Sequence, residues 1–103
     1  MKIEFYFAFN PEKNITLLKE RGISFEQIIA LIEENCILDI IDRPNQSKYP
    51  NQKIYIIEVD GYCYLVPCII NGKEIFLKTI IPSRKATKNY LKIKDSREQN
   101  EKI

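Results

Sequence analysis

The chain has 103 residues and a formal net charge of +2, and its 45% hydrophobic and 29% charged side chains are typical of one soluble globular domain. No histidine is present, which excludes the commonest general acid–base residue and, with it, Ser-His and Cys-His nucleophilic catalysis. No apolar run approaches the roughly 20 residues of a membrane-spanning helix, and the start does not fit a signal peptide, so we expect a cytoplasmic protein.

The first elements are predicted from apolar spacing and capping residues. Apolar side chains alternate over residues 3–9, which predicts a first strand. Asn10 before Pro11 is typical of a helix start, and Gly22 is typical of a helix end. The expected buried stripe of this first helix is Ile15, Leu17 and Leu18.

A second helix and a long loop are expected next. Ser24 and Gln27 have the spacing of a capping box, and the helix that they begin loses its apolar pattern near Asn35. Residues 37–41 form a short β-rich run, and residues 43–52 form a polar loop that contains two prolines. The chain therefore begins with one strand and two short helices.

Three consecutive strands are predicted after the loop. Asp-Gly at 60–61 and Asn-Gly at 71–72 separate apolar runs, and both dipeptides favour type I′ hairpin turns, which need positive φ at both central residues. The three runs therefore form an antiparallel meander. Pro67 cannot donate to a ladder hydrogen bond, so we expect a bulge or a local break in the middle strand.

The meander is predicted to be apolar on both faces. One face is expected to carry Tyr55, Ile57, Val59, Tyr62, Tyr64, Val66, Cys68, Ile75, Leu77, Thr79 and Ile81. The other is expected to carry Ile54, Ile56, Glu58, Cys63, Leu65, Ile69, Glu74, Phe76, Lys78 and Ile80. The two helices can cover one face, and the other face needs the C-terminal segment or a partner chain.

The cysteines do not form a metal site by sequence pattern. Cys36, Cys63 and Cys68 lack CxxC spacing and have no histidine to join them, so we expect no metal and no cofactor. Cys63 and Cys68 are separated by an odd number of residues, which places them on opposite faces of a strand. All three are expected to be small buried hydrophobic residues.

The C-terminal part is predicted to restart as a helix. Ser83 is a suitable cap, and Ala86, Tyr90 and Leu91 follow at helical spacing. The chain shows no repeat and no second domain, so we expect a single domain over residues 1–92 and a polar, frayed tail over residues 93–103.

Positive charge is concentrated in one fifth of the chain. Residues 73–92 hold six basic side chains against Glu74 alone, whereas the rest of the chain is slightly acidic. A charge run is often only a solvated helix face. Here, Arg84 and Lys85 are expected at a strand end beside the tyrosine-bearing strands, and basic side chains beside aromatic rings are typical of single-stranded RNA sites.

Two stretches resemble the BrnT branch of the RelE/ParE-like toxins of bacterial toxin–antitoxin pairs. FNPEKNITLLKERGISFEQI (9–28) is similar to the BrnT pattern of an aromatic, a polar turn, a Lys, a helix and a GVSFEEA-like loop. IFLKTIIPSRKATKNY (75–90) is similar to the closing strand and the Ser-Ala-Arg-x-Ala signature of that family. The family's Lys-His before the glycine is Glu20-Arg21 here, and its basic residue in the last strand falls on Thr79.

The resemblance implies a RelE-like α+β fold with one strand, two short helices, an antiparallel meander sheet and a C-terminal helical segment. It also implies an endoribonuclease toxin that cuts mRNA, free or on the ribosome, without a metal. A cognate antitoxin would hold this toxin inactive.

Four residues are candidates for the chemical roles that metal-free RNA cleavage requires. The 2′-OH attacks the adjacent phosphate, which requires a base, positive charge at the transition state and a proton for the 5′ oxygen. Arg84 can bind the phosphate through two N–H groups, so we assign it transition-state stabilisation. Tyr64 or Tyr90 could act as the acid or orient the 2′-OH, or could simply pack. Glu58 is a possible base, although an ion pair with Lys78 is the simpler prediction.

Further basic residues are expected to bind phosphates: Lys78, Lys85, Lys88 and, at lower rank, Lys13 and Arg21. An alternative function is a non-catalytic RNA-binding or protein-binding module of the same fold, including a ParE-like toxin that targets gyrase. The missing histidine and the displaced basic residue of the last strand favour this alternative.

Overall fold

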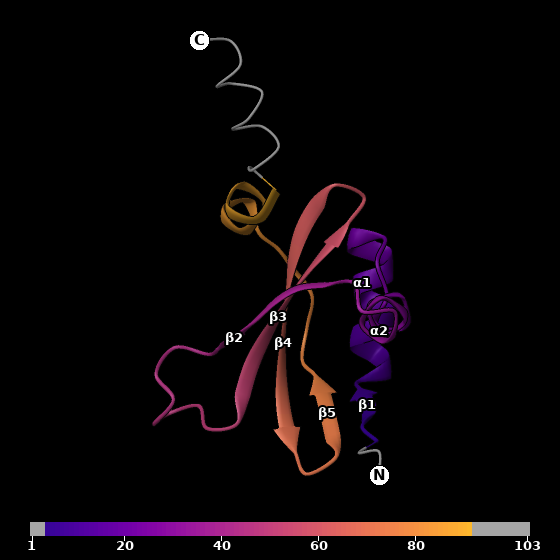
Figure 1. The fold of residues 1–103 in the computed structure, drawn as a ribbon. Coiled ribbons are helices and arrows are strands. Elements are labelled where there is room, and N and C mark those ends of the chain that lie inside the picture. The colour runs from indigo at the N-terminus through magenta and orange to yellow at the C-terminus, as the bar shows by residue number, and fades with distance from the viewer. Residues whose placement is uncertain (1–3, 92–103) are drawn as a thin grey trace, which may run out of the picture.

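A computed structural model describes residues 4–91 and shows an α+β fold in which three helices pack on a mixed, open sheet (Figure 1). The elements in chain order are β1 (Tyr6–Phe9), α1 (Pro11–Arg21), α2 (Phe25–Glu33), β2 (Ile37–Asp42), β3 (Gln52–Val59), β4 (Tyr62–Asn71), β5 (Glu74–Leu77) and β6 (Ile81–Pro82). A third helix spans residues 84–91. The tail over residues 93–103, which we expect to fray, lies outside the described residues.

The sheet has the strand order β1-β5-β4-β3-β2. β1 pairs with β5 in parallel, whereas β2, β3, β4 and β5 pair antiparallel with their neighbours. The short β6 pairs with β4 beyond the end of β5. The predicted order of one strand, two helices and an antiparallel meander is therefore confirmed.

The caps of the first two helices also agree with the sequence. The Asn10 side chain accepts hydrogen bonds from the backbone N–H groups of Glu12 and Lys13 at 2.8 and 3.1 Å. Gly22 ends α1 with φ of 69°, a left-handed conformation that favours glycine. Ser24 Oγ accepts a hydrogen bond from the N–H of Gln27 at 3.1 Å, which begins α2.

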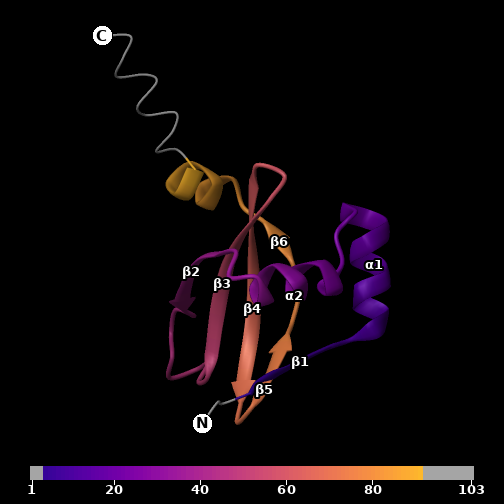
Figure 2. The ribbon, with the colours of Figure 1, turned by 45° about the vertical axis from the view of Figure 1, so that its right-hand side comes forward.

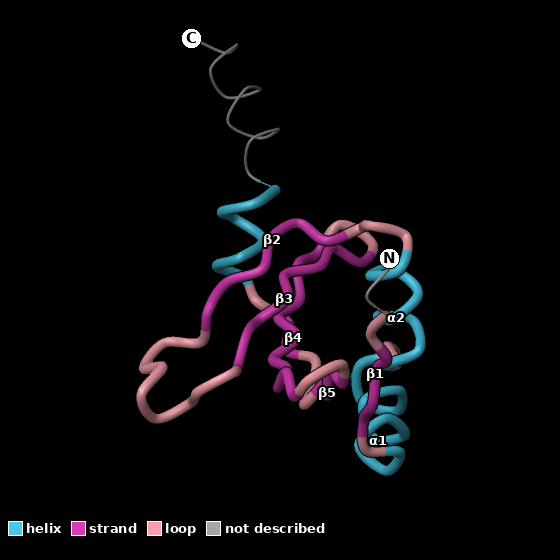
Figure 3. Tube along the Cα trace, turned by 60° about the horizontal axis from the view of Figure 1, so that its bottom comes forward, coloured by secondary structure: helices cyan, strands magenta, loops and turns pink. Residues whose placement is uncertain are grey.

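The sheet lies between two unequal layers of helices. α1 and α2 cover one face, and helix 84–91 lies over one end of the opposite face (Figure 3). Figure 2 shows that α2 lies across the strands. In the same view α1 lies beside the edge of the sheet that is formed by β1 and β5. The main core lies between the sheet and α1 and α2; its fully buried members include Phe25, Ile28, Ile57, Val66, Cys68, Leu77 and Ile80. A smaller core of Ile56, Cys63 and Ala86 lies under helix 84–91.

The two hairpin turns differ from each other. Asp60 and Gly61 have φ of 53° and 81°, as the predicted type I′ turn requires. The second prediction was wrong, because Asn71 pairs with Glu74 as the last rung of the ladder and the turn is centred on Gly72 and the residue after it. Of the residues in this second turn, only Gly72 has positive φ, at 63°. The register shifts by an even number of residues, so the side chains keep their predicted faces.

The irregularity expected at Pro67 occurs on the neighbouring strand instead. β4 is continuous, and Pro67 pairs with Ile54 of β3 in an unbroken register. The Pro67 carbonyl accepts a hydrogen bond from Lys78 N–H at 2.8 Å, so the side of Pro67 that lacks a donor faces residues 78–80, where β5 has ended. This break changes the alternation: Ile80 is fully buried in the main core, whereas Ile81 is 40% exposed. The prediction that Ile80 lies on the other face was therefore wrong, and so was the prediction that Ile81 continues the face of Leu77, because Ile81 pairs with Leu65 of the opposite face.

Two burial predictions were also wrong. Of the predicted stripe on α1, only Leu17 is buried, while Ile15 and Leu18 are 56% and 54% exposed. Cys36 is exposed, because it lies in the connection between α2 and β2. Cys63 and Cys68 are buried in different cores on opposite faces of β4, as predicted, and burial raises the pKa of both thiols. No helix within residues 4–91 is long and apolar enough to cross a membrane.

Candidate nucleic-acid interface

Helix 84–91 is fixed to the sheet by hydrogen bonds at its first turn. Ser83 caps it, because Ser83 Oγ accepts from the N–H of Ala86 at 3.0 Å. The N–H of Ser83 donates to the carbonyl of Cys63 at 3.0 Å, and Thr87 Oγ1 accepts from the N–H of Cys63 at 2.9 Å. These bonds hold the beginning of the helix against the start of β4.

The outer side of this helix is positively charged. Arg84 and Lys88 are one helical turn apart and exposed, and Lys85 is exposed beside them. None of the three pairs with a carboxylate within residues 4–91, where the one ion pair joins Lys53 to Asp42. Three cations that have no carboxylate partner in the described part of the chain form an anion-attracting surface on this helix.

A cavity of about 220 Å³ lies beside this helix. The sheet contributes an apolar floor, and the helix contributes a polar wall; the lining residues are Ile41, Ile56, Leu65, Ser83, Lys85, Ala86, Asn89 and Tyr90. The volume is below the roughly 300–1,000 Å³ of typical small-molecule sites, so it suits a part of a ligand, such as one base or one ribose phosphate.

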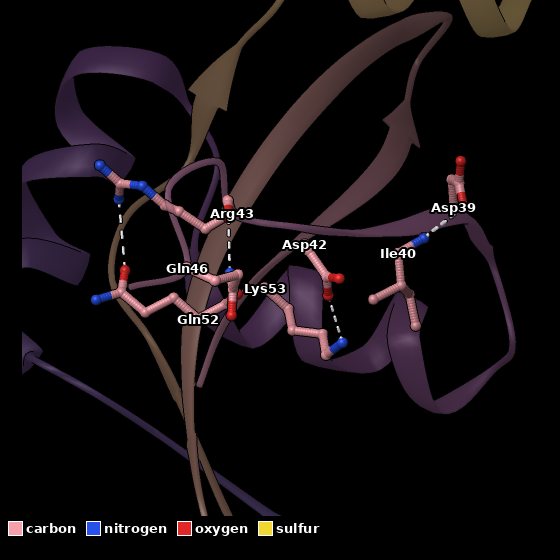
Figure 4. A network of polar contacts seen from close by, with 7 residues as sticks. All are labelled: Asp39, Ile40, Asp42, Arg43, Gln46, Gln52 and Lys53. Carbon is pink, nitrogen blue, oxygen red and sulfur yellow. Dashed lines mark hydrogen bonds and ion pairs between the residues drawn. The ribbon is translucent and has the colours of Figure 1, made fainter. Parts of the chain in front are cut away.

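Tyr90 joins the helix to β2 at the edge of this cavity. Its hydroxyl donates a hydrogen bond to Asp39 Oδ2 at 2.6 Å, while Asp39 Oδ1 accepts from the N–H of Ile40 at 2.8 Å (Figure 4 shows the Asp39–Ile40 bond). The hydrogen bond to Asp39 raises the pKa of Tyr90, since it favours the protonated hydroxyl. Tyr90 is therefore a poor base on its own, but its hydroxyl is held in one orientation.

Sequence reasoning missed Asp39. Its pairing opposite Ile56 depends on an irregularity in the β2–β3 register between Ile37 and Asp39, which no local pattern indicates. One signal was available: Asp39 is the single charged residue inside the apolar run 37–41. A lone carboxylate in such a run favours a specific partner.

The other two predicted catalytic residues are not at this cavity. Tyr64 pairs with Ile57 and packs against the main core, so it lies on the face that α1 and α2 cover, opposite to Tyr90. Glu58 is exposed and pairs with Cys63 on the face of helix 84–91. It does not line the cavity, because Cys63 lies under the Thr87 side of the helix whereas Lys85 and Asn89 line the cavity.

The expected ion pair between Glu58 and Lys78 was wrong. The two residues share a face, but Lys78 lies near the other end of β3, where its Nζ is 3.5 Å from Gln52 Oε1. The chain leaves the strand path after Leu77, so the Lys78 side chain approaches the β2–β3 loop.

The basic residues of the first helix lie away from the candidate site. Arg21 donates from Nη1 to the carbonyl of Ile80 at 2.6 Å, which ties the end of α1 to the break after β5. Lys13 is exposed on α1, in the helix layer on the other side of the sheet. The structure therefore brings Lys85 and Tyr90 together at the cavity, exposes Arg84 and Lys88 on the same helix outside its lining, and places the remaining predicted residues elsewhere.

The predicted neighbourhood of basic and tyrosine side chains was wrong in one respect. The tyrosines of β3 and β4 face α1 and α2, and Tyr55 is 7% exposed. Helix 84–91 lies on the opposite face, over Ile56, Cys63 and Leu65. Of the tyrosines, Tyr90 of the helix itself is the one that lines the cavity.

A second cavity lies on the side of α2, with a volume of about 840 Å³. It carries Glu4 and Glu33 and no basic residue in its lining, so its charge opposes phosphate binding. No group of three or more Cys, Asp or Glu side chains within residues 4–91 is arranged to hold a metal ion.

Comparison of the chain with protein families, with curated proteins and with solved structures finds no match. The resemblance of residues 9–28 and 75–90 to the BrnT family therefore stays a hypothesis.

Proposed function

We propose that the protein is the toxin of a bacterial toxin–antitoxin pair, a cytoplasmic, metal-independent endoribonuclease of the BrnT type that cuts mRNA. The observation that supports this function most is a small cavity lined by Lys85 and Tyr90, on a helix that also exposes Arg84 and Lys88, with the Tyr90 hydroxyl oriented by Asp39. Cations for the phosphate and a fixed hydroxyl for the ribose are what metal-free RNA cleavage needs.

In this proposal Arg84 binds the scissile phosphate and stabilises the charge of the pentavalent transition state. Lys85, at the rim of the cavity, neutralises the same phosphate, and Lys88 binds the next one. None of the three is paired with a carboxylate within the described chain, so each is available to a phosphate.

Proton removal in this proposal uses Tyr90 and Asp39 together. The raised pKa of Tyr90 disfavours a tyrosinate as the base. Instead, the Tyr90 oxygen accepts the proton of the 2′-OH while its own proton passes to Asp39 Oδ2, 2.6 Å away. The 2′ oxygen then forms a bond to phosphorus, the bond to the 5′ oxygen breaks, and that oxygen takes a proton from water. The product is a cyclic phosphate.

A cognate antitoxin is the proposed partner. β2 is an edge strand, since it pairs with β3 alone within the described residues, and its side chains Leu38, Ile40 and Ile41 are 40%, 46% and 38% exposed. An apolar edge strand favours the addition of a strand or helix from another chain. The Tyr90–Asp39 bond ends on the same strand, so a chain bound at β2 would also restrict access to the cavity.

Inducible expression in bacteria tests the function. The wild-type chain is expected to arrest growth, and Arg84→Ala is expected to relieve the arrest with an unchanged circular dichroism spectrum. Lys19→Ala, which removes an exposed cation of α1 on the other side of the sheet, is the matched control and should remain toxic. An Arg84→Ala protein as toxic as wild type would exclude the proposed role of this residue.

One observation favours the alternative, a non-catalytic binding module, including a ParE-like toxin. The Tyr90 hydroxyl is already bound to a carboxylate, and the carboxylate already accepts two hydrogen bonds. A purely structural hydrogen bond between Tyr90 of helix 84–91 and Asp39 of β2 would have the same geometry. Purified protein separates the two functions, because a binding module retards RNA in a gel and leaves it intact.

A further inference from the structure

A second group of cations lies at the β2–β3 loop, away from helix 84–91. The guanidinium carbon of Arg43 stacks 3.9 Å from the ring centroid of Tyr49, and Lys48 Nζ is 5.4 Å from the same centroid. Arg43 Nη1 also approaches Gln52 Oε1 at 3.4 Å (Figure 4). The ring and the amide hold the guanidinium in place, and within residues 4–91 one of its five N–H donors is used.

Two cations converge on one neutral oxygen in this loop. Lys78 Nζ is 3.5 Å from the same Gln52 Oε1 that Arg43 approaches. No carboxylate within residues 4–91 pairs with either cation, and the neighbouring Asp42 pairs with Lys53 instead. Both contacts to Gln52 are long for hydrogen bonds, so most of the binding capacity of the two cations is unused. Like charges drawn together without a counterion favour the binding of an anion between them.

This loop cluster faces the same side as helix 84–91. Figures 1 and 3 show the loop and the helix projecting from the side of the sheet opposite to α1 and α2. Gln52 lies four residues before Ile56 on β3, so the cluster is about 13 Å from the cavity floor at 3.3 Å per strand residue.

The surface between the two cation groups is apolar. Ile54 lies between Gln52 and Ile56 on the same face, and Ile69 and Phe76 lie beside Gln52 on β4 and β5. These three side chains are half-buried, so an aromatic ring and two aliphatic side chains remain available for contact. A sheet with an accessible aromatic side chain beside a group of cations is suited to bases that stack while their phosphates bind Lys or Arg.

We propose that Arg43, Gln52 and Lys78 form a second phosphate-binding site, which holds a single-stranded RNA that runs from helix 84–91 along this face of the sheet. The inference rests on the proposed RNA-directed function and names the path of its substrate. Arg43 binds the phosphate with its free N–H groups, Lys78 adds a second charge, and Phe76 stacks with a base next to this second site. An acidic peptide would satisfy the cations but not the apolar strip between them.

Gln52→Glu is the sharpest test. The new carboxylate would pair with Arg43 and Lys78 where the amide lies, so the fold is preserved while the anion site is neutralised. Gln27→Glu is the matched control, since Gln27 is exposed on α2 on the other side of the sheet. Lys78→Gln, with Lys19→Gln as its control, tests the same site by removal of a cation.

The measurement is fluorescence anisotropy of a labelled 2′-O-methyl oligonucleotide, which cannot be cut because its attacking hydroxyl is blocked. Gln52→Glu and Lys78→Gln are expected to weaken binding by about 3- to 10-fold and to reduce the slope of log affinity against log salt by about 0.7 for each lost phosphate contact. Both control variants should bind as wild type does.

Three results would overturn the site. The first is wild-type affinity for Gln52→Glu and Lys78→Gln while Arg84→Ala loses binding; the RNA would then not reach the loop, and the proposed nuclease would stand. The second is displacement of the oligonucleotide by polyglutamate as effectively as by unlabelled RNA at equal charge, which would assign the cluster to an acidic protein. The third is no binding by the wild-type chain. In contrast, the expected loss in the two variants together with intact natural RNA would support the site and reject the nuclease.

Discussion

Thr87 connects the cationic helix to the sheet, and Thr87→Val removes that connection with little change in shape. Thr87 Oγ1 accepts from the buried N–H of Cys63 at 2.9 Å and donates to the carbonyl of Ser83 at 2.8 Å. Valine can do neither, so the Cys63 amide would lose its partner. A buried amide without a partner costs about 1–3 kcal/mol.

The affected equilibrium is the docking of helix 84–91. Most of the stability of a protein helix comes from packing, so residues 84–91 stay helical because they are docked on the sheet. Loss of about 1–3 kcal/mol makes the undocked state about 5- to 150-fold more populated. The hydrogen exchange rate of the Cys63 amide should rise by the same factor, whereas the amides of β3 that pair with β4 should change less.

Hydrogen exchange measured by NMR tests this prediction, with Thr16→Val as the control. Thr16 Oγ1 makes the same type of bond, to the carbonyl of Glu12 at 3.1 Å, but accepts from no amide and is exposed on α1. Thr16→Val should therefore change the free energy of unfolding by less than about 0.5 kcal/mol. Unchanged exchange at Cys63 in Thr87→Val, or an equal rise at every amide of the sheet, would refute the docking argument.

Three further predictions concern single residues. Burial raises the pKa of Cys68 from 9.0 to about 11, so the folded state holds this proton more tightly; the resulting stability is complete below pH 9 and is lost as the pH rises to about 11. The full shift corresponds to at most about 2.7 kcal/mol, and about 1–2 kcal/mol after solvent screening, and Cys68→Ala should remove this part of the alkaline loss in denaturant titrations from pH 8 to 11. Asn14→Ala should lower the free energy of unfolding by about 1–3 kcal/mol, because the Asn14 side chain accepts from the part-buried N–H of Phe25 at 2.7 Å; no change in the denaturation midpoint would contradict this. Tyr90→Phe should abolish RNA cleavage but retain RNA binding, and a parallel loss of both would favour the role of a strut to Asp39.

Local signals in the sequence were sufficient for most of the elements. Capping residues such as Asn10 and Ser24 act within a few residues of themselves, and both caps formed as predicted. The alternation of β4 placed Cys63 and Cys68 on opposite faces for the same reason. Asp60 and Gly61 supplied a turn whose geometry the dipeptide nearly determines.

Features that depend on distant parts of the chain were missed. Ile15 and Leu18 fit a helical stripe, but the position of α1 beside the sheet leaves them exposed. β5 ends at Leu77, and the alternation of side chains between the two faces is reversed after it. Pro67 on the adjacent strand has no N–H group, so it cannot donate a hydrogen bond to the residues after Leu77. These outcomes follow from strand pairing and helix placement, which a single-sequence pattern does not contain.

The candidate site was predicted in part for the same reason. Arg84, Lys85 and Tyr90 lie within the same helix, so their presence on one element followed from the sequence. Asp39 lies near Tyr90 because β2 pairs with β3, which the sequence pattern did not indicate. Tyr64 lies outside the candidate site because its side chain is on the face that α1 and α2 cover.

The most direct test of the proposed nuclease is the incubation of purified protein with single-stranded RNA in excess chelator, followed by analysis of the product ends. The mechanism through Arg84 and Tyr90 predicts defined fragments that end in a 2′,3′-cyclic phosphate and no fragments with Arg84→Ala. Intact RNA that is merely retarded in a gel, or cleavage that requires a divalent cation, would contradict it.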